Sequence, residues 1–399
     1  MTTFLIRRAI QMVVVILLSA VASYALLNFA PGGPLTEIRQ RQQDPRFQLT
    51  AEDVARIRAY FELDLNVGVR FMRWLVGEPR GPLVIGGQEY FGDWVIGCAE
   101  TIEQSVRLSN GQFETQTVGC AKTVTLKEIT GRRTSRGVLF GDFGLSWKLL
   151  RDRPVADLLM SRIPKTIQLM LISTVLSLII AIPLGVYSAV RQYSRFDYFF
   201  TTLAFLGNAM PTFFFGIAFI LLFSILPKGA GWFYLPPGSS EAVREYMVPG
   251  LGVVQPGSWL DIVLHLTLPV TVLTIVNVAG FSRFVRGSML EVLRQDYVRT
   301  ARAKGLVETV VIARHALRNA LIPFITIVVF ALPALFGGAV ITESIFSWPG
   351  MGRLFLLALG QSDYPVAMAM LFITAVLTVL ATLIADLLYM LVDPRIRYA

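Results

Sequence analysis

Long apolar segments constrain this chain more than any other feature. The hydrocarbon core of a bilayer is about 30 Å thick, so a helix that spans it needs about 20 predominantly apolar residues. Enough such stretches occur to predict an all-α polytopic membrane protein with six transmembrane helices. We expect these helices at about Ala9–Ala30, Thr166–Val190, Phe199–Leu226, Ile262–Phe284, Leu321–Ile341 and Val366–Val392. The first begins like a signal peptide, but its apolar run is too long, so we expect a retained span.

The composition agrees with a membrane protein. Hydrophobic residues make up 54% of the chain, and the formal net charge is +9. In a soluble protein this charge would suggest nucleic acid as a partner. Here basic loops on the cytoplasmic side of a membrane explain the charge, so we expect no nucleic-acid partner. Only two cysteines and two histidines occur, and they predict no metal centre.

Basic residues gather in the loops that the six spans place on one side of the membrane. The positive-inside bias therefore predicts a multi-pass protein of the plasma (inner) membrane with both termini in the cytoplasm. The long segment 31–163 also contains arginines, but long segments translocate largely regardless of charge, so we expect it outside. The basic positions on the cytoplasmic side are Arg7, Arg8, Arg191, Arg195, the loop 296–319, Arg395 and Arg397.

The external segment has an organisation of its own. Thr50 and Asp53, three residues apart before an apolar pattern, predict a helix that begins with a capping box. Residues of about 80–138 are rich in Gly, Thr and Val with short alternations, which predicts a small β-rich insert. Cys98 and Cys120 lie in this insert, and outside the membrane they can form a disulfide. Two unpaired cysteines are the alternative.

Motifs for catalysis are missing from the sequence. No G-x-x-x-x-G-K-[ST] phosphate loop occurs, so we do not expect the chain to hydrolyse ATP or to be an enzyme. The spans hold almost no ionisable residue near their centres, which argues against an ion-coupled carrier. Asp386 comes nearest, and we expect it to pair with a basic residue or to lie at a helix interface.

The loop at 296–319, DYVRTARAKGLVETVVIARHALRN, is basic and helix-forming and separates two apolar segments. Gly305 divides it and permits a turn conformation that other residues resist. A polar loop this regular predicts a docking site for another protein, and we interpret it as the coupling loop of a transporter powered by a separate ATPase. A solvated loop that only obeys the positive-inside rule is the alternative. The expected coupling residues are Asp296, Tyr297, Arg299, Thr300, Ala301, Arg302, Ala303, Lys304, Gly305, His315, Arg318 and Asn319.

Several short motifs follow one another along the chain. They are Ile6-Arg7-Arg8 before the first span, Phe140-Gly141-Asp142-Phe143-Gly144-Leu145-Ser146, Met210-Pro211-Thr212-Phe213 with Gly216, Tyr297–Gly305 with Arg314–Ala320, Glu343–Gly352 and Asp393-Pro394-Arg395. In these features the chain resembles the inner-membrane permease subunit of a binding-protein-dependent ABC importer, in the oligopeptide, dipeptide and nickel branch. Two features depart from the general pattern. Arg299-Thr300-Ala301 stands where such permeases have Glu-Ala-Ala, and the insert at about 80–138 has no counterpart that we recognise.

The resemblance implies a permease subunit of an ATP-driven importer for di- or oligopeptides. It implies a second homologous permease, one or two ATP-binding subunits that hold ATP and Mg, and an external solute-binding protein, while this chain binds no cofactor and contacts membrane lipid. The expected organisation is a first helix at 1–30, the external segment 31–163, and a five-helix core at 164–399 with a cytoplasmic coupling loop at 286–319. The exact solute stays open. An ATP-independent carrier or channel is the alternative function.

Half of the translocation path is then expected from this chain. Amide, proline and glycine residues within the spans are the candidates to line it. Small and amide residues equally hold membrane helices together, so this second interpretation stays open. The candidate path residues are Asn208, Pro211, Asn277, Gly337 and Gly338.

Overall fold

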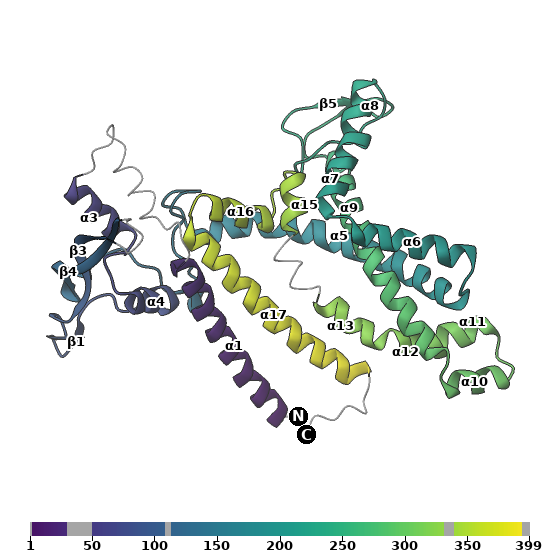
Figure 1. Cartoon of the computed structure of the whole chain (residues 1–399), viewed down its shortest axis with the longest axis horizontal. Coiled ribbons are helices and arrows are strands. Elements are labelled where there is room, and N and C mark those ends of the chain that lie inside the picture. The colour runs from purple at the N-terminus through teal and green to yellow at the C-terminus, as the bar shows by residue number, and fades with distance from the viewer. Residues whose placement is uncertain (1, 30–49, 108–112, 331–338, 393–399) are drawn as a thin grey trace. The chain divides into compact units, whose positions relative to one another are not determined.

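The computed structural model describes residues 2–29, 50–107, 113–330 and 339–392, and the fold is set out for these residues (Figure 1). They belong to two compact units. One unit comprises Met1–Ile16, Leu159–Leu357 and Ile373–Ala399, and the other comprises Leu17–Leu158 and Ala358–Phe372. Helices α1 (Thr2–Phe29) and α17 (Tyr364–Val392) each contribute to both units.

The first unit is helical apart from one short hairpin. Its helices α5 and α16 extend a few residues into the second unit. The elements are α5 (Val155–Val190), α6 (Arg195–Ala209), α7 (Thr212–Ile220), the π-helical η3 (Leu221–Ile225), α8 (Leu226–Gly229), β5 (Tyr246–Val248), β6 (Gly252–Val254), α9 (Trp259–Val292), α10 (Asp296–Ala303), α11 (Glu308–Val310), the π-helical η4 (Val311–Leu317), α12 (Arg318–Ala320), α13 (Ile322–Phe330), α15 (Val340–Ile345) and α16 (Met351–Gly360).

The described residues contain five helices long and apolar enough to cross a membrane, or six if one bent pair is counted as a span. The five are Ile6–Asn28, Val155–Val190, Thr212–Gly229, Trp259–Val292 and Tyr364–Ile384, and the pair is Glu308–Ala320 with Ile322–Val329, bent by 49°. The prediction of a polytopic helical membrane protein is confirmed. Residues 331–338 of the predicted fifth span, which was expected at about Leu321–Ile341, lie outside the described residues.

The predicted start of the third span was wrong. A single helix was expected from about Phe199, but α6 ends at Ala209 and the apolar span begins at Thr212. Pro211 explains the break, because proline has no backbone N–H and disfavours helical geometry in the residue before it. Met210 accordingly has extended dihedral angles of φ −86° and ψ 134°.

Helices α5 and α9 form the centre of the first unit. A Cβ added to Gly185 of α5 would lie 2.7 Å from the carbonyl oxygen of Ser282, so glycine allows the two helices to approach closely. Near this crossing, Val285 and Met289 are fully buried and belong to a cluster that also includes Ala316 of η4. The second half of the 296–319 loop is therefore part of the core.

Both ends of the first unit's sequence meet in an ion pair. Arg8 of α1 contacts Asp386 of α17, and both side chains are partly buried. The expectation that Asp386 pairs with a basic residue is confirmed. The pair explains how a carboxylate is accommodated in an apolar helix, because a buried charge is tolerated when an opposite charge compensates it.

Among the described residues, the second unit holds two helices of its own and two β-hairpins, besides its shares of α1, α5, α16 and α17. Its elements are α3 (Ala51–Tyr60), α4 (Val67–Val76), β1 (Leu83–Ile85), β2 (Gln88–Tyr90), β3 (Val95–Arg107), β4 (Phe113–Thr125), and the 3-10 turns η1 (Lys127–Ile129) and η2 (Val138–Phe140). Thr50 and Asp53 form the predicted capping box at the start of α3. The predicted β-rich insert is confirmed as the antiparallel pairs β1–β2 and β3–β4.

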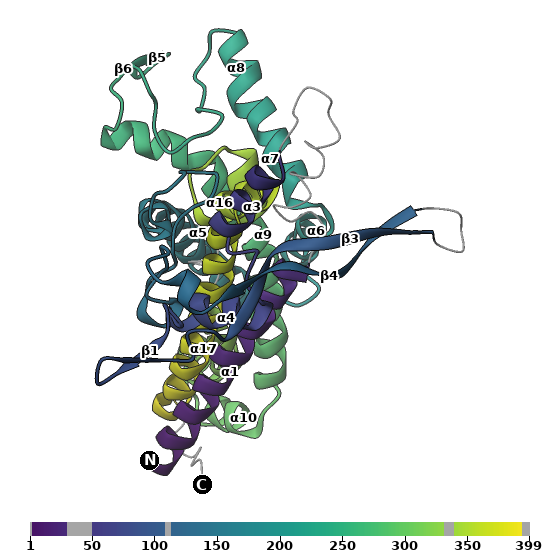
Figure 2. The same cartoon turned by 90° about the vertical axis from the view of Figure 1, so that its left-hand side faces the viewer.

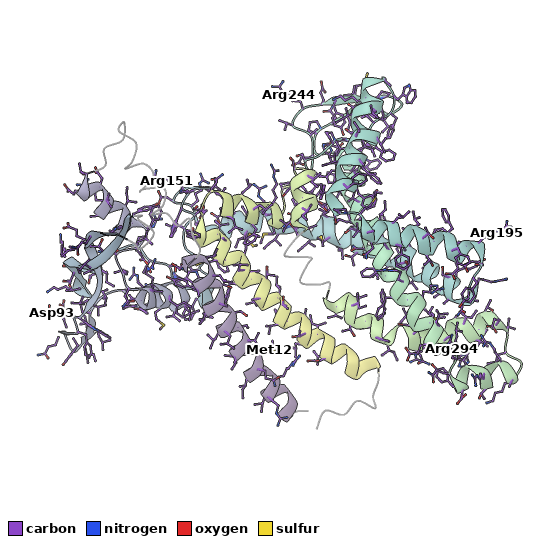
Figure 3. All side chains as sticks on the ribbon, viewed as in Figure 1. Met12, Asp93, Arg151, Arg195, Arg244 and Arg294 are labelled. Carbon is purple, nitrogen blue, oxygen red and sulfur yellow. A yellow bond between two sulfur atoms is a disulfide. The ribbon has the colours of Figure 1, made fainter. Side chains whose placement is uncertain are left out.

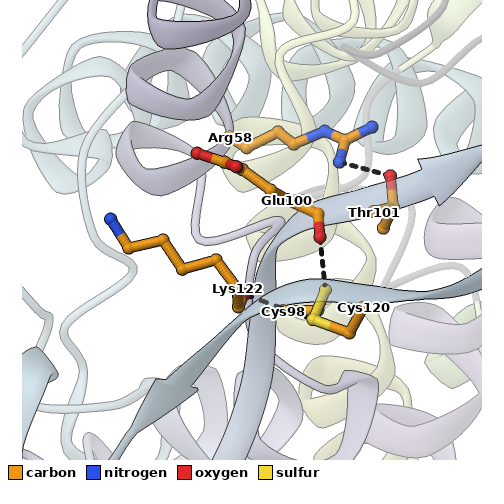
Figure 4. The surroundings of a disulfide bond; sticks show 6 residues. All are labelled: Arg58, Cys98, Glu100, Thr101, Cys120 and Lys122. Atoms are coloured by element: carbon orange, nitrogen blue, oxygen red, sulfur yellow. Dashed lines mark hydrogen bonds between the residues drawn. A yellow bond between two sulfur atoms is a disulfide. The ribbon is translucent and has the colours of Figure 1, made fainter.

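The β3–β4 hairpin is a long ribbon that extends beyond the helices of its unit (Figure 2). The base of the ribbon packs on the rest of the second unit through buried Ile96, Val124 and Leu126, which cluster with Leu65. The structure joins Cys98 and Cys120 in a disulfide across the two strands. Arg58 of α3 donates a hydrogen bond of 2.9 Å to the Thr101 hydroxyl beside it (Figure 4).

Candidate functional site

The 296–319 loop is a folded knob rather than a solvated strand of chain. Figure 3 marks Arg294 in the turn where α9 ends, before α10 begins at Asp296. On α10, Val298 and Ala301 are three residues apart and therefore lie on one face of the helix. Both are buried, together with Val311 of η4, in a small apolar cluster. This cluster holds α10 against the following helix.

The buried face of α10 changes the interpretation of one predicted coupling residue. Ala301 was among the expected coupling residues, but it is 5% exposed and packs within its own chain. Ala303 lies on the exposed side of α10, as do Tyr297, Arg299 and Thr300. The part of the loop that another protein can reach is thus its outer face.

Gly305 ends α10 and turns the chain. Its φ of +76° is in the left-handed region, which L residues with a side chain rarely adopt. The backbone N–H of Gly305 donates to the Arg302 carbonyl at 2.9 Å. A Cβ built at this position would have no atom of the chain within 4 Å, so the turn is open to its surroundings.

The exposed face combines charge with apolar side chains. Arg302 forms a two-point ion pair with Glu308, with N–O distances of 2.7 and 3.1 Å. The basic side chains of Lys304, Arg314 and Arg318 are exposed and have no ion pair among the residues that the structure describes. Leu306, Val307 and Val310 are exposed beside them, with Val307 reaching 68%. Such a surface suits a partner that offers carboxylates around an apolar cleft.

His315 and Asn319 have structural roles in the described chain. The Asn319 side-chain amide donates to the His315 carbonyl at 3.0 Å, within the bend between η4 and α13. Both residues are half-buried. A π-helical turn frees backbone carbonyls from the regular helical pattern, and the Asn319 amide donates a hydrogen bond to one of them. We therefore interpret both residues as supports of the knob.

A paired substitution tests the inward face of α10. Val298→Ala is expected to lower the free energy of unfolding by about 1–2 kcal/mol, because two buried methyl groups are lost at about 0.8 kcal/mol each. Val307→Ala is the matched control, since Val307 is 68% exposed and should change stability little. Thermal unfolding of the two purified variants in one detergent measures both effects. Equal unfolding temperatures would contradict the packing of α10 against η4.

The candidate path residues that the structure describes do not gather in one cavity. Asn208 and Pro211 are exposed, and Asn277 is half-buried. Gly337 and Gly338 lie outside the described residues. The first unit does have a cavity of about 220 Å³ between α5, α6 and α9, but Asn208, Pro211 and Asn277, the candidates that the structure describes, do not line it.

That cavity ends at an ion pair that the sequence analysis missed. Arg286 of α9 contacts Asp197 of α6 through two hydrogen bonds of 2.8 and 2.9 Å. Asp197 is 3% exposed. The pattern Ser194-x-x-Asp197 marks the start of α6, because the Ser194 hydroxyl caps the helix by accepting from the Asp197 N–H, but it does not indicate the pairing with Arg286. The pair fixes α6, whose first residue, Arg195, is marked in Figure 3.

The motif Glu343–Gly352 is organised by a buried carboxylate. Glu343 is fully buried and accepts hydrogen bonds from the Thr166 hydroxyl at 3.0 Å and the Arg353 N–H at 2.9 Å. Burial raises the pKa of Glu343 above its usual value, and these hydrogen bonds oppose that shift. A Cβ on Gly350 would lie 2.4 Å from the Glu343 carboxylate, which explains the glycine. The motif therefore anchors the connection between α15 and α16 on α5.

Asp363 plays the corresponding part in the second unit. It is fully buried at the start of α17, and sequence reasoning did not identify it. Its carboxylate accepts from the Ser146 hydroxyl and from the backbone N–H groups of Trp147, Lys148 and Leu149. The segment Phe140–Ser146 thus ends on the first turn of α17.

Comparisons with known proteins show which family and which relatives the chain matches. Residues 181–398 match the family described as binding-protein-dependent transport system inner membrane component. The chain is 48% identical over 259 residues to the oligopeptide transport system permease protein AppB of Bacillus subtilis. The matched residues make up 65% of this chain and 77% of AppB. It is 38% identical over 273 residues to the dipeptide transport system permease protein DppB of Escherichia coli K12. The matched residues make up 66% of this chain and 78% of that protein. The di/tripeptide permease DppB of Pseudomonas aeruginosa is 40% identical over 244 residues, which are 59% of this chain and 71% of the relative.

Proposed function

Because the chain belongs to the family of binding-protein-dependent transport system inner membrane components, we propose that it is a permease subunit of an ATP-driven importer for di- or oligopeptides. The observation that carries the peptide assignment is its similarity to permeases named for oligopeptide and dipeptide transport, over about two thirds of the chain. In this function the chain catalyses no reaction. It forms half of the pathway, and a second homologous permease forms the other half.

The outer face of the 296–319 knob is the proposed contact with the ATPase. Support comes from the exposed Lys304, Arg314 and Arg318, which can pair with carboxylates of the partner, and from the apolar residues beside them. One or two ATP-binding subunits hold ATP and Mg, and this chain binds no cofactor. Since Ala316 of the same loop and the adjacent Ala320 pack on α9, a displacement of the knob reaches a membrane helix directly.

Both termini are proposed to lie in the cytoplasm. The basic residues near Arg7 and in the 296–319 loop then face the side that favours positive charge. The segment 31–163 lies outside under this orientation. Its β3–β4 ribbon, stapled by the Cys98–Cys120 disulfide, is the proposed contact with the solute-binding protein. A disulfide is compatible with an oxidising compartment outside the cytoplasm.

Co-purification and transport together test the proposal. The chain, isolated from native membranes in mild detergent, is expected to retain a second permease and ATP-binding subunits. Reconstituted in vesicles with the solute-binding protein, this complex should accumulate a labelled di- or oligopeptide only when ATP is supplied. A chain that is recovered alone and transports without ATP would instead support the alternative, a self-sufficient carrier or channel.

A further inference from the structure

A cavity in the second unit lies at the ends of two candidate membrane helices. Its volume is about 760 Å³, and its lining includes Tyr24 and Asn28 from the last turns of α1 and Tyr364 and Met368 from the first turns of α17. Both helices are long and apolar enough to cross a bilayer. Their ends therefore mark the level at which the hydrocarbon core meets the polar headgroups. Coupling to an ATPase through the 296–319 knob makes no use of this cavity.

Aromatic rings form two walls of the cavity. On one side, the ring centroids of Tyr24 and Trp74 are 5.4 Å apart. On the other side, Trp147 packs against Phe61 at 4.6 Å and against Tyr364 at 6.0 Å. Tyrosine and tryptophan are enriched at membrane interfaces, because their rings prefer the headgroup level. The walls thus suit a ligand with an apolar part near a polar group.

Most charges around the cavity are already compensated. Three of the lining arginines face a carboxylate, in the pairs Arg73–Glu62, Arg132–Asp64 and Arg133–Asp152, with N–O distances of 2.6, 2.7 and 3.8 Å. Asp142, another lining residue, accepts hydrogen bonds from the backbone N–H groups of Arg136 and Gly144. These groups have little left to offer a ligand.

Two donors on α4 remain without an acceptor in the part of the chain that the structure describes. Arg70 has no ion pair among the described residues, and its Nε is buried and makes no hydrogen bond. The indole Nε1 of Trp74 is likewise buried and unsatisfied. The two residues are four positions apart, so they lie on the same face of α4, and both line the cavity. A buried donor that lacks its acceptor is costly, and two such donors side by side indicate a missing acceptor.

We propose that this cavity binds the phosphate headgroup of an acidic phospholipid. Arg70 supplies a planar, permanently charged guanidinium, which matches phosphate oxygens better than a lysine ammonium does. Trp74 donates a second hydrogen bond from its indole N–H. The aromatic walls enclose the glycerol region, and the acyl chains continue into the bilayer beside α1 and α17. The lipid thereby bridges a membrane helix end and α4.

Lipid retention by the full-length chain tests the site. The chain, with the subunits that accompany it, is placed in nanodiscs of phosphatidylcholine that contain phosphatidylglycerol, extracted with detergent and analysed by native mass spectrometry. Wild type is expected to retain phosphatidylglycerol. Arg70→Gln and Trp74→Phe should each reduce this retention about tenfold, which is the effect of one lost hydrogen bond to a charged group. Arg70→Lys keeps the charge and should retain more lipid than Arg70→Gln.

Arg80→Gln is the matched control, since Arg80 lies in the same unit but does not line the cavity. It should retain phosphatidylglycerol as wild type does, and unfolding temperatures should confirm that all variants are folded. Equal retention by Arg70→Gln and Arg80→Gln would overturn the proposal. Displacement of the lipid by soluble glycerol phosphate would assign the site to a free phosphate ester, and displacement by a dipeptide would assign it to a peptide carboxylate. Either result rejects a lipid site, and neither depends on whether the chain transports peptides.

Discussion

Gly305→Trp is expected to abolish most ATP-driven peptide uptake while the chain stays folded and assembled. A Cβ at this position meets no atom of its own chain within 4 Å, so we expect the larger side chain to project from the turn towards the proposed ATPase surface. The left-handed φ of +76° adds a strain of about 1–2 kcal/mol. Uptake into vesicles should fall at least about tenfold, which corresponds to about 1.4 kcal/mol of lost coupling. ATP hydrolysis and uptake, measured on the same vesicles, separate transport from nucleotide turnover.

Gly305→Ala is the control for the backbone strain. Alanine carries the same left-handed penalty but no bulk, so a much smaller loss of uptake is expected. If both substitutions reduce uptake equally, strain in the turn explains the effect and the docking surface lies elsewhere. If Gly305→Trp transports like wild type, the turn does not face the ATPase at all.

Asp363→Ala is expected to destabilise the second unit by about 3–5 kcal/mol. The substitution leaves the Ser146 hydroxyl and the N–H groups of Trp147 and Leu149 without their acceptor, along with that of Lys148. An orphaned buried donor costs about 1–3 kcal/mol, and the partly buried positions can recover some hydrogen bonds from water. Thermal unfolding followed by tryptophan fluorescence measures the loss, because Trp147 lies at the site.

Two further variants make the Asp363 result specific. Asp363→Asn keeps one acceptor oxygen and the side-chain volume, so its loss should be intermediate. Ser146→Ala removes one donor together with its need for an acceptor and should cost about 1 kcal/mol. A wild-type unfolding temperature for Asp363→Ala would refute the role of this carboxylate as the anchor of the 146–149 segment.

Local patterns in the sequence predicted a large part of this fold. Hydropathy located the spans, because membrane helices must satisfy their backbone hydrogen bonds internally and face lipid with apolar side chains. The Thr50–Asp53 capping box and the alternation before Thr125 likewise depend on residues close in sequence. The loop with Gly305 was recognised in the same way, since helix formers around one glycine predict a helix, a turn and a second helix.

The partners of isolated polar residues could not be predicted in this way. Asp363 and Ser146 are 217 positions apart, and Asp197 and Arg286 are 89 apart. Nothing in the neighbourhood of either carboxylate indicates which donor it meets. Even within α10, the pattern did not show that Ala301 faces the chain while Ala303 faces outwards, because that choice depends on where Val311 packs.

The sequence by itself determined that this chain crosses a membrane several times and carries a basic, helical loop divided by Gly305. These properties follow from hydropathy and local propensity, which act over a few turns of helix. The tertiary structure alone decided which face of that loop is free, which buried carboxylates anchor the connecting segments, and that Arg70 and Trp74 line one cavity with the ends of α1 and α17. Burial and hydrogen-bond satisfaction are properties of the packed chain, so they emerge only when distant segments are brought together.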